Sequence, residues 1–230
     1  MRASRDRHTK AVARRLGALA LLLIGLTSTA AGLAYWRAAA IYPGDREAAR
    51  TRIAEAGTPR LMEYTLGAKY LTACVDVMSH WTFAVEPTAD RARLSETCAQ
   101  AARAQRRQSG PTAEAELVFA LAAHLAGDRA RTLRHVAASQ ALAPRDLWIT
   151  IKRVELVLSA LPEEDLARQR DYFGGEFRIL AGSNRGVNTA VALYAKYPGL
   201  RPALLDVAGD MSPGDRLRFL NRVKRVAAGG

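Results

Sequence analysis

Clusters of proline, glycine and helix-capping residues recur along the chain after residue 42 and divide it into segments of helical length. Within these segments, apolar residues return at spacings of three and four, the period of an amphipathic helix. No segment alternates apolar and polar residues over the length of a strand. We therefore predict an all-α protein. The expected helices span residues 46–56, 59–84, 88–108, 113–126, 129–143, 145–160, 162–182 with a bend near Gly174 and Gly175, 187–197, 202–208 and 213–227.

The N-terminal segment 16–36 has 21 residues and no charge, which matches the roughly 20 apolar residues that a helix needs to cross a bilayer. Six basic residues precede it, and Tyr35 and Trp36 close it with side chains that prefer the membrane interface. The basic excess places the N-terminus in the cytoplasm and the rest of the chain outside. The predicted regions are a basic cytoplasmic N-terminus (1–15), a transmembrane anchor or signal segment (16–36), a juxtamembrane segment (37–58) and a periplasmic helical-repeat domain (59–230).

A cleaved signal peptide is the alternative for this N-terminal segment. Its apolar centre would be Leu16–Leu26, followed by the small residues Ser28, Thr29 and Ala30 as a cleavage site. Both alternatives export the domain. We expect a single-pass protein of the bacterial inner membrane with a periplasmic domain, or a periplasmic protein after cleavage.

Cys74 and Cys98 are the two cysteines of the chain, and an exported chain meets an oxidising compartment. Glu86, Pro87 and Thr88 interrupt the helical pattern midway between them, twelve residues from each cysteine to Glu86. Residues equidistant from the turn of an antiparallel hairpin lie side by side. This spacing predicts a disulfide between two neighbouring helices; two unrelated buried thiols are the alternative.

Residues 113–146 form a 34-residue stretch with the pattern of a helix pair. A large and then a small residue occupy positions seven and eight, a Gly-Asp turn follows, small residues lie in the second half, and proline ends the stretch. These residues are Phe119, Ala120, Gly127, Asp128, Thr132, Ser139 and Pro144. The gap-free pattern resembles a tetratricopeptide (TPR) repeat, although Ala123 stands where the family has tyrosine and Lys152 occupies a small-residue position of the next repeat.

This resemblance implies a right-handed array of antiparallel helix pairs that binds a protein on its concave surface, and it implies no chemistry. Residues 59–108 and 145–181 are degenerate candidates for neighbouring repeats.

The sequence offers no catalytic, cofactor-binding or metal-binding constellation, and we predict that the protein is not an enzyme and has no cofactor. The acidic run 163–165 favours a helix start, where the helix dipole stabilises acidic side chains. His124 and His135 fall on the paired helices of the repeat and could approach each other, but two histidines without an acid or cysteine make a poor metal site, and packing or surface roles are favoured. The polar segment 183–186 is expected to be an inter-helix loop rather than an anion site.

The net charge of +12 comes from 34 basic residues, of which 29 are arginine, and 22 acidic residues. No nucleic-acid recognition motif accompanies them, so we expect no nucleic-acid partner, while an anionic lipid or polymer remains a candidate ligand. Large apolar residues near helix ends are candidates for a partner-binding surface. They are Trp81, Phe83, Trp148, Tyr172 and Phe173.

These features together predict a membrane-anchored periplasmic scaffold or adaptor for a protein partner in export, secretion or surface-polysaccharide machinery. The alternative is an accessory single-span subunit of an inner-membrane complex, suggested by small and polar residues within the anchor, such as Gly17, Gly25, Ser28 and Gly32. An enzyme of unrecognised type is the third hypothesis.

Overall fold

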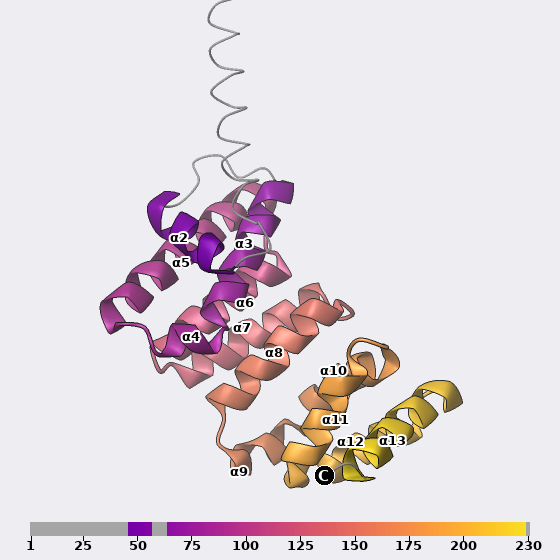
Figure 1. The fold of residues 1–230 in the computed structure, drawn as a ribbon. Helices are drawn as coiled ribbons and strands as arrows, with labels where there is room; N and C mark the ends of the chain where they lie inside the picture. The colour runs from indigo at the N-terminus through magenta and orange to yellow at the C-terminus, as the bar shows by residue number, and fades with distance from the viewer. Residues whose placement is uncertain (1–45, 57–63, 229–230) are drawn as a thin grey trace, which may run out of the picture.

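The computed structural model describes residues 46–56 and 64–228, and every regular element in them is helical, which confirms the all-α prediction (Figure 1). The helices are α2 (Arg46–Ala56), α3 (Tyr64–Met78), α4 (Trp81–Ala84), α5 (Thr88–Ser109), α6 (Ala113–Leu125), α7 (Arg129–Leu142), α8 (Leu147–Ala160), α9 (Glu163–Leu166), η1 (Ala167–Gln169), α10 (Arg170–Gly182), α11 (Val187–Lys196), η2 (Pro198–Leu200), α12 (Arg201–Gly209) and α13 (Pro213–Ala228).

Side-chain caps fix where several of these helices begin. The side chains of Thr112, Asp128 and Asp146 each accept a hydrogen bond of 2.9–3.2 Å from the backbone N–H three residues further along. Ser212 accepts the backbone N–H of Asp215 at 3.2 Å and donates its hydroxyl to the Asp215 carboxylate at 2.8 Å. These bonds satisfy N–H groups that the first helical turn leaves without an intrahelical partner. The predicted starts of α6 and α13 are therefore confirmed.

Two predicted helices differ from the structure. The helix expected over 59–84 is interrupted at Ser79 and His80, and the short α4 follows. The bend expected at Gly174 lies earlier, in η1, and α10 runs through Gly174 without interruption. A Cβ at this glycine would lie 3.2 Å from the Val207 side chain, so the glycine serves the close packing of α10 against α12 instead of a bend.

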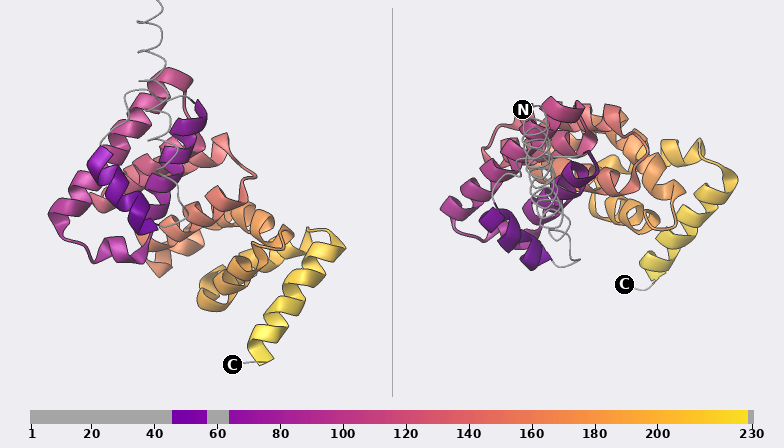
Figure 2. Two further views of the ribbon diagram at one scale, coloured as in Figure 1. Left: turned by 45° about the horizontal axis from the view of Figure 1, so that its top comes forward. Right: turned by 90° about the horizontal axis from the view of Figure 1, so that it is seen from above.

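The helices form an elongated, curved array in which α2 lies near one end and α13 at the other (Figure 2). Helices α3, α5 and α6 pack together, and α6 and α7 share the most extensive contact of any described helix pair. Helix α8 then connects this group to α10, against which α11, α12 and α13 pack. Among the described residues no helix is both long and apolar enough to span a membrane. The predicted anchor, 16–36, lies outside them.

A disulfide joins Cys74 of α3 to Cys98 of α5, with 5.8 Å between the Cα atoms. Both side chains are fully buried, and α3 and α5 pack against each other along this line. The pairing predicted from the two equal spacings is confirmed. The bridge fixes the relative position of the two helices at the N-terminal end of the array.

A buried ion pair joins the two halves of the array. Arg153 of α8 donates two hydrogen bonds to the Glu176 carboxylate of α10, at 2.7 and 3.0 Å, and neither side chain is exposed. Arg153 also donates to the backbone carbonyls of Ser139 and Ala143, at 3.3 and 3.1 Å, where α7 ends. The guanidinium thus satisfies the C-terminal carbonyls of one helix while it pairs with a carboxylate on another.

Candidate functional site

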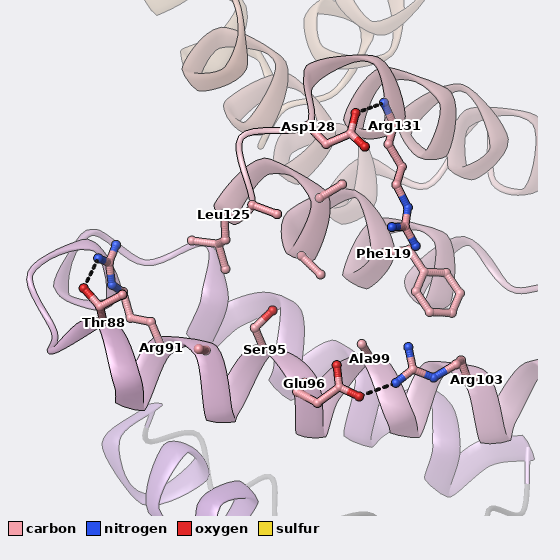
Figure 3. Close-up of a pocket in the computed structure, with 14 residues that line it drawn as sticks. Thr88, Arg91, Ser95, Glu96, Ala99, Arg103, Phe119, Leu125, Asp128 and Arg131 are labelled. Atoms are coloured by element: carbon pink, nitrogen blue, oxygen red, sulfur yellow. Dashed lines mark hydrogen bonds and ion pairs between the residues drawn. The ribbon is translucent and has the colours of Figure 1, made fainter.

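A groove of about 410 Å³ runs along α5 and is closed on its other side by the C-terminal part of α6 and the first turn of α7 (Figure 3). Helix α5 contributes residues at helical spacings from Thr88 to Arg103, so a single face of this helix forms one wall. The residues that line the groove are Thr88, Arg91, Ala92, Ser95, Glu96, Ala99, Arg103, Phe119, Ala122, Ala123, Leu125, Ala126, Asp128 and Arg131.

Small side chains make up much of the groove on both walls. Ala92, Ser95 and Ala99 recur at spacings of three and four on α5, and Ala122 of α6 lies four residues before Ala126, the residue that follows the end of that helix. Because small side chains at these positions leave the space between the two helices unfilled, another backbone can approach. The groove is therefore shaped for an extended or helical segment.

Arginine side chains dominate the charge of the groove. Arg103 pairs with Glu96, and the Asp128 carboxylate caps α7, so both acidic groups of the lining already have partners. Among the described residues Arg91 donates only to the Thr88 hydroxyl, at 3.3 Å, and its buried Nε has no hydrogen-bond partner there. The Arg131 side chain extends toward Phe119 in Figure 3. Within the described part of the chain neither Arg91 nor Arg131 has a carboxylate partner.

A polar cluster behind the groove holds Phe119 in place. Glu116 is almost completely buried and accepts a 2.7 Å hydrogen bond from His135 Nδ1, with Arg106 at 3.4 Å from its other oxygen. The His135 ring lies 5.4 Å from the Phe119 ring, centroid to centroid. Because a buried carboxylate needs such partners, the cluster fixes α6 against α5 and α7 and thereby fixes the shape of the groove.

His124 and His135, the two histidines of the repeat, each contact a different residue. His135 faces Glu116, whereas His124 lies 3.4 Å from the Ser159 hydroxyl on α8, and burial lowers the pKa of His124 below its ordinary value. The two imidazoles therefore contact different partners. No cluster of three metal-ligating side chains is found in the ranges 46–56 and 64–228.

The predicted partner-binding residues occupy other places. Phe83 and Phe173 lie in the core, while Trp148 and Tyr172 are half-buried and pack against it. The side chain of Trp81 lies outside the described part of the structure. None of the four described side chains lines the groove.

Sequence reasoning looked for large apolar residues and therefore missed the groove. The small-residue stripe along α5 was the signal that could have indicated it.

The residues that carry the repeat resemblance lie in the α6–α7 pair. Ala120, Thr132 and Ser139 are fully buried, and the Ser139 hydroxyl donates to the Ala113 carbonyl at 3.0 Å. Gly127 has a φ of 74°, a left-handed conformation that glycine adopts at little cost, and it reverses the chain between the two helices.

Comparison of the chain with protein-family models, with curated proteins and with solved structures finds no match. The class that the described residues define is an all-α helical array with an arginine-lined groove.

Proposed function

We propose that the protein is a membrane-anchored adaptor with a helical-repeat domain, and that it binds an acidic segment of a protein partner in the groove between α5 and the α6–α7 pair. This proposal rests on two features of the groove: the small side chains on both of its walls, and two arginines, Arg91 and Arg131. Neither arginine has a carboxylate partner within residues 46–56 and 64–228. The small side chains leave room for a peptide backbone, and the arginines favour acidic side chains on that peptide.

The α6–α7 pair supports placing the domain among TPR-like repeats, which bind proteins through the surfaces of stacked helix pairs. Its turn glycine and its buried small residues suit such a pair. The segment 16–36 supplies the proposed anchor in the bacterial inner membrane, with the domain in the periplasm. The disulfide agrees with an oxidising compartment. The partner would then belong to an envelope assembly such as export, secretion or surface-polysaccharide machinery.

Co-purification from native membranes in mild detergent tests this proposal. The variant Arg91→Glu/Arg131→Glu reverses the groove charge at two side chains whose only described polar contact is that of Arg91 with the Thr88 hydroxyl. The matched control is Arg107→Glu/Arg134→Glu, which changes the net charge equally at two exposed positions outside the groove. We expect the native chain and the control to retain a stoichiometric partner that raised salt releases, and the groove variant to lose it. Retention of the same partner by the groove variant would contradict the proposal.

The accessory-subunit alternative makes a different demand on the anchor. If the protein were a subunit held by its membrane helix, replacing residues 16–36 with an unrelated span would abolish co-purification even with the groove intact. The adaptor proposal expects this replacement to leave the partner bound.

A further inference from the structure

Helix α13 carries more than half of the net charge of the described chain. Residues 46–56 and 64–228 contain 26 basic and 19 acidic side chains, a balance of +7. The sixteen residues of α13 include five basic residues and one acidic residue, Asp215, which gives the helix a net charge of +4. Arg218 pairs with Asp215 at 2.9 Å. The four remaining cations have no carboxylate partner in the described structure, and they are Arg216, Arg222, Lys224 and Arg225.

One side of α13 packs on the domain and the opposite side is exposed. Phe219 is fully buried and forms edge-to-face contacts with Phe177 of α10 and Tyr194 of α11, at centroid distances of 5.0 and 5.8 Å. Leu217, 59% exposed, and Leu220, 37% exposed, lie on the outward face together with Lys224, because residues three and seven apart share a helix face. Figure 2 shows α13 as the outermost helix at the C-terminal end of the array.

The occupant of this outward face must be anionic and must accept apolar side chains. A second copy of the same helix is disfavoured because it would bring together two helices that each carry a charge of +4. An anionic bilayer surface satisfies both conditions. Leucines enter the boundary between headgroups and acyl chains, while long basic side chains keep their charges among the phosphates.

We propose that the outward face of α13, formed by Leu217, Leu220 and Lys224 and flanked by Arg216 and Arg225, docks onto an anionic lipid surface. This contact is independent of the groove: it uses the opposite end of the array from α2, and a loss of one interaction would leave the other (Figure 2). An adaptor held in this way would contact the membrane through α13 as well as through its proposed N-terminal anchor.

Amide hydrogen exchange of the full chain in lipid nanodiscs tests the proposal. The chain is placed in discs of phosphatidylcholine alone or of phosphatidylcholine mixed with phosphatidylglycerol. Each basic residue near an anionic surface contributes about fivefold to binding, so we expect exchange in 213–228 to be slower in the mixed discs by roughly tenfold or more. Raised salt should remove this protection.

Two double variants in α13 and one control on other helices test whether the protection comes from α13. Lys224→Glu/Arg225→Glu should abolish the protection, whereas Arg107→Glu/Arg134→Glu, with the same change in net charge on other helices, should retain it. Leu217→Gln/Leu220→Gln should weaken it with no change in charge. Equal exchange rates in the neutral and mixed discs would overturn the proposal, and so would an equal loss in both charge variants, which would indicate diffuse attraction. Protection of α13 by a co-purified protein but not by mixed discs would also overturn it and assign the face to a protein partner.

Discussion

Replacing Glu176 by glutamine should destabilise the fold more than any comparable change of charge on the surface. Arg153 and Glu176 are both completely buried and are joined by two hydrogen bonds, so the variant leaves the Arg153 guanidinium inside the protein without its counter-charge. Removing one partner of a buried ion pair costs about 3–5 kcal/mol. For a domain of this size each kcal/mol lowers the melting temperature by about 2–4 °C, so the expected drop is roughly 10 °C.

The matched control is Glu155→Gln on α8, the helix that also carries Arg153. Glu155 forms a 3.3 Å ion pair with Lys152 and is 50% exposed, and such surface pairs contribute about 0–1 kcal/mol. Thermal unfolding of the full chain in detergent, followed by circular dichroism, compares the two variants. If Glu176→Gln melted within about 1 °C of Glu155→Gln, which corresponds to well under 1 kcal/mol, the account of the buried pair would be refuted.

The double variant Arg153→Met/Glu176→Leu separates the ion pair from the helix caps. It removes both charges together, which should recover much of the loss caused by the single variant. It also removes the guanidinium from the carbonyls of Ser139 and Ala143. The Ser139 carbonyl keeps the backbone N–H of Ala143 at 3.0 Å, whereas the Ala143 carbonyl loses its described donor, and an unsatisfied carbonyl costs about 1–3 kcal/mol. We therefore expect the double variant to be more stable than Glu176→Gln and less stable than the native chain.

Further predictions concern the packing, the disulfide and the response to pH. Gly67→Ala should destabilise the protein by about 1–3 kcal/mol, although alanine normally favours a helix, because its Cβ would overlap the buried Gln105 side chain. Adding Gln105→Ala should restore stability in the same melts. Cys74→Ala/Cys98→Ala should cost about 3 kcal/mol, the value expected for a loop of this length, and an unchanged melting temperature would contradict it. Burial lowers the pKa of His124, so as the pH falls the imidazole takes up a proton in the unfolded chain before it does so in the folded chain. Stability should therefore decline below about pH 6.5. His124→Gln should flatten that decline in melts across the pH range.

The helix order and the disulfide followed from the sequence because both rest on local signals. Caps such as Thr112 and turn residues such as Gly127 act within a few residues, and the spacing of Cys74 and Cys98 around one turn translates directly into a helix pair. The break before α4 was missed because His80 caps the helix that follows it, and histidine is not among the preferred capping residues.

The groove and the buried ion pair depend on contacts that no local pattern contains. Arg153 and Glu176 lie 23 residues apart, and each is unremarkable in its own helix until α8 and α10 pack. The aromatic residues proposed as a partner surface include Phe83 and Phe173, which the structure places in the core, because large apolar side chains at helix ends serve packing as readily as binding. The alanines of the groove carried little weight in the sequence because alanine is common throughout it.

Site-specific photo-crosslinking in intact cells tests the adaptor proposal most directly. A photoreactive residue at Ala92, which is exposed and lies in the groove, is compared with the same residue at Arg107, which is exposed on α5 outside it. The account predicts one discrete adduct from position 92, absent from position 107, lost in the Arg91→Glu/Arg131→Glu background and linked to an acidic segment of the partner. Equal adducts from both positions, or an adduct at 92 that survives the reversal of groove charge, would contradict it.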